Sequence, residues 1–569
     1  MEKSKRSPFH RAFYVANTME IFERLAWYGF FTLSSLYMTS PKAQGGLAFT
    51  DVERGFLQGM IPFLLYIFPV ITGALADRYG YRRMFLVAFS IMCPSYYLLG
   101  QVHSFWTFCA VFLMVAVGAA CFKPVVVGTV GRSTDDSNRG LGFGVFYTMV
   151  NIGGFLGPLV AGYVRAVSWD LVFVMSAVWI AINFIPVLFF YKEPAHDAEK
   201  DQRSLKLVLL EAQEVLGNGR LAMMVIPAVV ALMVTTKLGI GFGIYLLGVV
   251  LWVLLNLGWS ALFAANANSQ KASAWYREKI RVGDKDFVLY LVIMTGFWVM
   301  YNQLFLTLPL YIRDFVDTKD VVDFLAHWLP SSVDFLASVN LDQLSASLPA
   351  MADQYALGVD AHGFRQIAYD LLNYKVKVPD EILRNGLIAL HNGSATAPQL
   401  AQAWAASYRQ VNPEYLVNID FGAIVICQIA VSAFFQRFKA LPILVLGTLL
   451  FSVGMFLCGL GNQFATGGVV IAFVVLILAF GEMIASPKSQ EYVAAIAPKS
   501  KTAMFMGYYF VSMALGYLFA GLLSGWSYSV LAKEMQQPLL MWALFALIGG
   551  LTGLALIVFN IRIKRKAQQ

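Results

Sequence analysis

Residues 12–38 read AFYVANTMEIFERLAWYGFFTLSSLYM, an apolar stretch long enough for a helix to cross a bilayer, with charges near its middle. A bilayer core of about 30 Å takes about 20 mostly apolar helical residues. Each charge at its centre costs roughly 2.5–3.5 kcal/mol, so these charges cannot face lipid. Spacings of three and four residues place on one helix face Glu20, Glu23, Arg24, Trp27 and Tyr28. The stretch predicts a membrane helix whose polar face lines a cavity or meets another polar helix; an internally paired structural cluster is the alternative.

The rest of the chain also has the composition of a membrane protein. Of its 569 residues, 58% are apolar or aromatic and only 13% are charged, which is too little to cover several soluble domains. Its apolar runs are continuous, and this excludes a barrel of short alternating strands. Fourteen runs predict an all-α membrane protein with fourteen spans, near residues 12–38, 55–76, 83–101, 105–129, 141–163, 170–190, 221–236, 239–263, 286–312, 416–436, 440–460, 467–485, 502–524 and 539–561.

Lysine and arginine are concentrated on one side of the predicted membrane. They precede the first run, follow the second, fourth and sixth runs, and close the chain, which places them together if the spans alternate. The positive-inside rule then predicts a multi-pass protein of the inner (plasma) membrane with both termini in the cytoplasm. The net charge of +8 reflects this topology. Nucleic-acid binding is not predicted, because no basic patch with interleaved aromatic residues occurs.

One hydrophilic block, residues 314–414, interrupts the apolar pattern. It holds 12 acidic and 6 basic side chains and no long apolar run, so we expect it outside the membrane. Apolar residues recur in it at helical spacing between Pro and Gly positions, which predicts a small helical insertion on the extracytoplasmic side. The block is either a tolerated surface insertion or a lid, substrate funnel or partner site.

Two charges stand alone in other runs, and a charged turn follows the second run. Lys123 lies near the end of the fourth run and Glu482 in the last third of the twelfth. Each either extends to the membrane surface or pairs across the protein. The turn holds Asp77 and Arg78 between Gly73 and Gly80, with Arg82 after the second glycine, and such groups can hold neighbouring helix ends together through charge-assisted hydrogen bonds. A membrane-surface anchor would explain the arginines alone.

These stretches resemble motifs of the proton-dependent oligopeptide transporter (POT) family of the major facilitator superfamily. Glu20–Gly29 is similar to ExxERFxYYG, and Gly73–Arg82 is similar to the superfamily's GxxxDRxGxR turn. Tyr66 also lies eleven residues before Asp77, as a binding-site tyrosine does in that family. Further stretches that agree in order are Cys121–Pro124, Phe146–Pro158, Phe297–Gln303, Gly481–Pro487 and Ala497–Gly507. The resemblance covers nearly everything except the hydrophilic block.

The resemblance implies the major facilitator fold, with two six-helix bundles and an extra helix pair between them. The boundaries that we expect are 1–192 for the N-terminal bundle, 193–285 for the linker and extra pair, 286–313 for the first helix of the C-terminal bundle, 314–414 for the insertion and 415–569 for the rest.

It also implies roles for single residues. Arg24 and Lys123 would bind a peptide carboxylate and Glu482 the amino terminus, which suits a zwitterion because its two ends need fixed opposite charges. The implied substrate-binding residues are Arg24, Tyr28, Tyr66, Lys123, Asn151, Trp298, Asn418 and Glu482. The implied proton-coupling residues are Glu20, Glu23 and Arg24, and the implied gating residues are Asp77, Arg78 and Arg82.

The chain departs from the family pattern at three positions. Many members carry an arginine and an acid where this chain has Phe31 and Asn302, and those two groups can pair as an outer gate. Tyr509 stands where a tryptophan is usual. We therefore expect the outer gate to differ while the proton and carboxylate groups are retained.

The function expected from these residues is proton-coupled import of di- and tripeptides by alternating access. Its partners would be short peptides, protons and the lipid bilayer. The alternatives are a transporter of another organic anion or zwitterion, and a non-transporting receptor that binds a partner through the hydrophilic block. No nucleophile–base arrangement, metal-ligand set or phosphate loop occurs, so an enzyme, a metal site and a cofactor are not predicted.

Overall fold

The computed structural model describes residues 9–134, 138–193, 213–237, 242–263, 275–497 and 502–568. Over these ranges the protein is helical, and the strand-like pairing described is limited to two isolated β-bridges. The helices before the linker are α1 (Arg11–Thr39), α2 (Asp51–Ile67), α3 (Pro69–Tyr79), α4 (Tyr81–Leu99), α5 (Phe105–Arg132), α6 (Arg139–Arg165), α7 (Trp169–Ile182) and the π-helix η2 (Pro186–Phe190).

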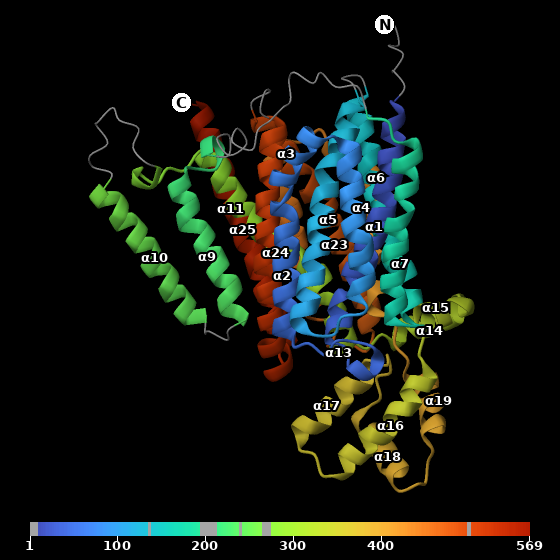
Figure 1. Ribbon diagram of the computed structural model, residues 1–569. Coiled ribbons are helices and arrows are strands. Elements are labelled where there is room, and N and C mark those ends of the chain that lie inside the picture. The colour runs from blue at the N-terminus through green and yellow to red at the C-terminus, as the bar shows by residue number, and fades with distance from the viewer. Residues whose placement is uncertain are drawn as a thin grey trace, which may run out of the picture.

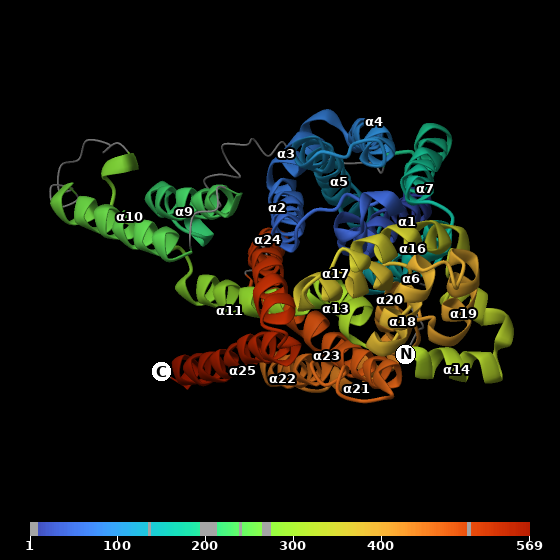
Figure 2. The same cartoon turned by 90° about the horizontal axis from the view of Figure 1, so that it is seen from below.

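The second half of the bundle follows two further helices, α9 (Gly219–Lys237) and α10 (Phe242–Phe263). Figures 1 and 2 both show α9 and α10 at one side of the bundle, with α10 farther out. The helices of the second half are α11 (Lys285–Tyr301), α12 (Gln303–Leu306), α13 (Leu308–Phe315), α20 (Pro413–Val417), α21 (Ile419–Phe435), α22 (Ala440–Cys458), α23 (Gly467–Ile496), α24 (Thr502–Ser527), the π-helix η6 (Tyr528–Glu534) and α25 (Pro538–Gln568).

The start of α1 and the end of α25 lie at one end of the bundle, and residues 314–414 lie at the other (Figure 1). In the described residues, eleven helices are long and apolar enough to cross a membrane. The all-helical membrane fold predicted from the apolar runs is confirmed, whereas the count of fourteen spans and the domain boundaries stay predictions. The predicted run and the observed helix differ most in length at α23. The apolar run ends near residue 485, whereas the helix continues to Ile496.

The two halves meet closely along α2 and α24. Gly55 and Gly59 of α2 face Gly521 and Gly525 of α24, and a methyl group on Gly525 would lie 2.7 Å from the carbonyl oxygen of Asp51. Glycine is needed here because the helix backbones touch. This contact fixes the first half against the second on the side of the bundle nearer to residues 314–414.

The hydrophilic block forms a small helical unit, which we call the cap (residues 314–414). Its helices are α14 (Lys319–Trp328), α15 (Val333–Leu336), α16 (Leu341–Ala356), α17 (Ala361–Leu372), α18 (Asp380–His391) and α19 (Ala397–Tyr408). Leu344, Leu348, Ile367, Leu383 and Leu387 are fully buried in an apolar core of its own. Seen from below, the cap lies over α1, α6 and α20 (Figure 2). Its helical nature agrees with the prediction from apolar spacing.

Candidate functional site

The three charges of α1 form one buried cluster. Arg24 Nε lies 3.2 Å from Glu20 Oε1, and the guanidinium also pairs with Glu23. All three side chains are at most 6% exposed. One oxygen of each glutamate has no hydrogen-bond donor. The predicted shared face is thus real, and the pairing alone agrees with both a structural and a transport role.

Helix α6 packs directly on the charged turn of α1. A methyl group on Gly153 would collide with the Cβ atom of Arg24, and one on Gly157 would lie 2.9 Å from the backbone nitrogen of Gly29. Two glycines four residues apart therefore let α6 approach α1 at backbone distance. This contact places Asn151, the neighbouring predicted site residue, one turn from the same crossing.

Lys123 extends toward this cluster from α5. Its Nζ atom lies 4.6 Å from the centre of the Tyr66 ring, a distance suited to a cation–π contact. Lys123 is close enough to act electrostatically on Glu20. Tyr66 in turn stacks on Tyr517 of α24, with ring centres 5.4 Å apart. Two cations, two carboxylates and the Tyr66 ring are thus gathered on the first half, with Tyr517 of the second half stacked against them.

The second half contributes an acidic group instead. Glu482 of α23 is 7% exposed, and its Oε1 atom accepts a hydrogen bond of 2.9 Å from the hydroxyl of Tyr301 on α11. The Tyr301 ring lies edge-on to Trp298, with centres 5.2 Å apart. Asp420 of α21 is completely buried, and its carboxyl group contacts that of Glu482. Sequence reasoning selected Trp298 and Glu482 but missed Tyr301 and Asp420.

Tyr28 lies between the two charged groups. The guanidinium carbon of Arg24 lies 5.6 Å from the centre of the Tyr28 ring, and the Tyr28 phenol also interacts electrostatically with Glu482. On its other side the ring meets Phe421 at 4.9 Å. The fold therefore brings the basic end, on the first half, and the acidic end, on the second half, to either side of one aromatic side chain.

Two predicted pocket residues make backbone contacts. Asn151 donates 2.8 Å to the carbonyl of Tyr147 one turn earlier, and Asn418 donates 2.9 Å to the carbonyl of Phe155 on α6. Asn418 thereby joins the second half to the first. The substrate-binding roles of both residues stay predictions.

The charged turn after α3 lies at the end of the bundle where the chain ends are. Arg82 donates 3.3 Å to the carbonyl of Val187 and 2.8 Å to that of Leu188, so it caps the π-helix at the end of α7. Arg78 is exposed beside Tyr79, and the side chain of Asp77 lies outside the described residues. Arg82 holds two helix ends together, and the gating role of the three residues stays a prediction.

At the cap side, the halves are joined by a different set of groups from the predicted outer gate. Phe31 stacks on Trp27 at 4.9 Å, and Asn302 donates to the carbonyl of Trp298 one turn back, so these two positions do not form an ion pair. Arg54 of α2 donates instead to the carbonyl of Leu306, at 3.0 Å, across the halves.

The helix break at Thr307 makes this contact available. It separates α12 from α13, and the carbonyl of Leu306 beside it accepts from both Arg54 and Ser35, the latter at 2.9 Å. Arg54 also donates 3.1 Å to Ser524 of α24. The cap side of the bundle is therefore closed by buried hydrogen bonds to a broken helix, in addition to the glycine contact of α2 and α24.

Comparison with known proteins agrees with this fold. The family model of the Major Facilitator Superfamily matches residues 21–326 and 388–569. The chain belongs to the Major Facilitator Superfamily. Only cap residues 327–387 interrupt the superfamily match, and they include α16 and α17.

Within the superfamily, several of the similar solved structures are POT transporters. A crystal structure of a POT family transporter in complex with 5-aminolevulinic acid has a TM-score of 0.61 at 17% identity, covering 97% of this chain and 96% of that one. A nucleoside transporter, NupG, also superposes, with a TM-score of 0.56 at 11% identity over 96% and 99% of the two chains. These structures share the fold, and their different cargoes show that the fold does not set the substrate.

A curated relative is similar in sequence over a shorter range. The di-/tripeptide transporter of Lactococcus lactis subsp. lactis (strain IL1403) is 29% identical over 179 residues, which is 30% of this chain. The matched part spans 35% of that relative's length.

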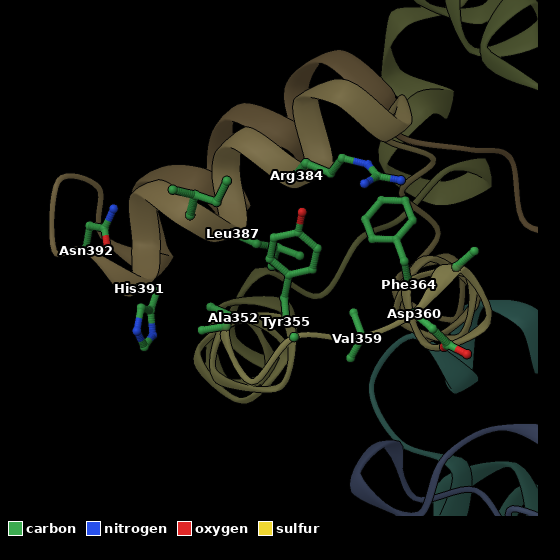
Figure 3. Close-up of a pocket in the computed structure, with 13 residues that line it drawn as sticks. Ala352, Tyr355, Val359, Asp360, Phe364, Arg384, Leu387, His391 and Asn392 are labelled. Atoms are coloured by element: carbon green, nitrogen blue, oxygen red, sulfur yellow. The ribbon is translucent and has the colours of Figure 1, made fainter.

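The cap of this superfamily member has a hollow of its own. A pocket of about 470 Å³ opens between α16, α17 and α18, and Figure 3 shows Tyr355 and Phe364 in its wall. Arg384 lies with its guanidinium carbon 4.0 Å from the Phe364 ring centre. At its edge His391 lies 3.2 Å from Asp353.

A partly buried amine, that of Lys375, lies where the cap meets the bundle. Lys375 donates 3.0 Å to the carbonyl of Ser338, and it faces the pair formed by Arg165 and Glu414, which are 3.4 Å apart. Burial, with a smaller contribution from Arg165, lowers the pKa of Lys375 to about 7. The contacts between cap and bundle thus include one amine, that of Lys375, whose charge state depends on pH.

Proposed function

We propose that the protein is a proton-coupled symporter that imports di- and tripeptides across the cytoplasmic membrane by alternating access. The observation that carries this proposal is the placement of opposite charges on opposite halves. Arg24 and Lys123 belong to the first half and Glu482 to the second, with Tyr28 between them. A short zwitterionic peptide has a carboxylate for one side and an ammonium for the other.

Coupling to protons follows from the α1 cluster. While Glu20 and Glu23 are ionised they neutralise Arg24, and protonation of one carboxylate releases the guanidinium for the peptide carboxylate. The charges at the two ends of the substrate draw the halves together, and the closed cap side described above is one state of the resulting cycle. Both termini are then cytoplasmic and the cap is outside, in agreement with the distribution of basic residues.

Uptake into proteoliposomes tests this function. A labelled dipeptide should accumulate under an inside-alkaline gradient, and Arg24→Ala should reduce accumulation to background. Arg384→Ala is the matched control, since it makes the same change at an exposed arginine of the cap. Uptake of wild-type size in Arg24→Ala would reject the site.

Transport of another zwitterion is the second candidate. The bound 5-aminolevulinic acid of the similar POT structure carries both an amino and a carboxyl group, as a peptide does. Competition with N-acetylated and C-amidated dipeptides separates the cases, because a peptide carrier that holds both ends should recognise neither analogue well.

A receptor that acts through the cap is the third candidate. The cap has its own core and pocket, so a partner could bind there without transport. Deletion of residues 320–410 tests this: if the remaining protein still binds and transports dipeptide, the receptor hypothesis is rejected.

A further inference from the structure

Asp420 is a buried acid with no counter-charge among the residues that the structure describes. It lies near the start of α21, within an apolar span, and its side chain is fully buried. Both of its carboxyl oxygens lack a hydrogen bond from any N–H or hydroxyl donor. Its carboxyl group meets the carboxyl group of Glu482 on α23. Two acids therefore face each other inside the membrane part of the protein.

The groups around the two acids are neutral. Phenols face them from three helices: Tyr301 on α11, Tyr147 on α6 and Tyr28 on α1. Among the described residues, the hydroxyl of Tyr301 is the one donor to the pair, and the second oxygen of Glu482 has none. Among the described residues, no lysine or arginine forms an ion pair with either acid.

Two ionised carboxylates cannot remain in contact in such a place. Burial raises the cost of each charge, and the repulsion between like charges adds to it, with no cation to offset either. One proton between the two groups removes one charge and makes an O–H···O hydrogen bond between the facing carboxyl groups of Asp420 and Glu482. We propose that Asp420 and Glu482 share one proton, and that this carboxyl pair is a second proton-binding site, on the opposite half from Glu20 and Glu23.

This inference rests on the proposed symport and adds a step to it. A proton from the outer water binds the carboxylate of Asp420, and the pair keeps one negative charge. Glu482 is then free to accept the ammonium of the peptide. When the site opens to the cytoplasm, water reaches the pair and solvates both carboxylates, so the O–H bond of Asp420 can break and the proton passes to water. Asn302 stands where many family members carry an acid, but it cannot bind and release a proton, because an amide does not titrate.

Asp420→Asn tests the inference, since the amide keeps the shape and can donate to Glu482 but carries no exchangeable charge. Accumulation of dipeptide driven by a proton gradient should fall at least tenfold, while counterflow exchange, which needs no net proton movement, should stay within twofold of wild type. Asp353→Asn, at an exposed acid of the cap, is the control. Unchanged gradient-driven accumulation, or equal loss of both activities, would overturn the assignment.

A second measurement does not depend on transport. Infrared difference spectra of the purified wild-type protein in lipid, recorded against pH, should contain the carbonyl stretch of a protonated buried carboxyl group. This band should be missing from the spectra of both Asp420→Asn and Glu482→Gln. Absence of that band in the wild type rejects the shared proton. If the band is present while wild-type protein moves no dipeptide, the proton site stands and the proposed substrate is wrong.

Discussion

The two charged regions inside the helical bundle are built differently, although each contains two buried acids. On α1, Glu20 and Glu23 are offset by Arg24, with Lys123 near enough to act on Glu20. Between α21 and α23 the acids have phenols around them and no cation among the described residues. The first region is close to neutral when fully ionised, and the second is not.

This difference assigns separate tasks to the regions. A neutral ion cluster exposes a cation only when an acid is protonated, so it suits an anion that arrives with a proton. A pair of acids with one proton keeps a negative charge and suits a cation. Under the proposed symport, the two ends of a zwitterion would meet regions of opposite character, and each region would be coupled to a proton.

The largest loss of transport and stability is expected when the charge balance of the α1 cluster is broken. Arg24→Ala leaves two acids buried without their cation, which typically costs 3–5 kcal/mol of stability, and it removes the carboxylate site. We expect transport at background and a clearly lowered midpoint of thermal unfolding in detergent. The double variant Arg24→Gln with Glu23→Gln should recover much of the stability and none of the transport. Recovery of transport in the double variant would show that the cluster is only structural.

The unbalanced pair should respond in the opposite way. Glu482→Gln removes a charge that has no partner, so stability should be unchanged or higher, while dipeptide binding loses a charged hydrogen bond worth roughly 1.5–3 kcal/mol. The dissociation constant for a dipeptide should rise about 10- to 150-fold. Competition by an N-acetylated dipeptide should be unaffected, because it has no ammonium. A drop in thermal stability as large as that of Arg24→Ala would contradict the contrast between the regions.

Both regions act on one substrate only if the halves can close. Gly521→Val should keep α2 and α24 apart, because a side chain there collides with the backbone of Gly59, and overpacking of this kind costs about 1–3 kcal/mol. Uptake should fall roughly 5- to 150-fold. Ser35→Cys, buried on the cap side, should become reactive to an impermeant maleimide in the Gly521→Val background.

Gly144→Val is the matched control for this closure, since nothing lies within 4 Å of the position where its side chain would begin. It should leave both uptake and labelling close to those of the parent. Equal labelling in the two valine variants would show that the glycine contact does not govern closure on the cap side.

The sequence predicted the balanced region well and the unbalanced one only in part. Charges three and four residues apart on one apolar helix can be placed together from helix geometry alone, so the face of Glu20, Glu23 and Arg24 followed directly. Asp420 has no such local partner, and its position next to Glu482 depends on how α21 packs against α23. A lone acid within an apolar run was nevertheless a visible signal, as Glu482 itself was.

The cap side shows the same limit. Phe31 and Asn302 correctly indicated that the usual ion pair is missing, but nothing local in the sequence showed that Arg54 would bind the carbonyl of Leu306. That bond needs a helix break in the second half and an arginine in the first half to meet, which is a property of the packed fold. Gly55 and Gly521 belong to the same class, since glycine spacing indicates a close contact without naming the partner helix.

Lys375 of the cap tests outside the membrane whether burial of a charge without a counter-ion lowers stability. Its expected effect is the smallest. The pKa of Lys375 is lowered to about 7 by burial, against an ordinary value near 10.5, so the unfolded chain holds more protons between these two values. Stability should therefore rise with pH from about 7 toward 10.5, by at most about 1.4 kcal/mol per pH unit, and be lowest below pH 7. Lys375→Met should flatten this dependence in thermal unfolding followed from pH 6 to 9, whereas Lys319→Met, at an exposed lysine paired with Asp323, should not. A pH dependence that survives Lys375→Met would show that the junction of cap and bundle tolerates a charged amine, and that an unpaired buried charge is less costly there than between α21 and α23.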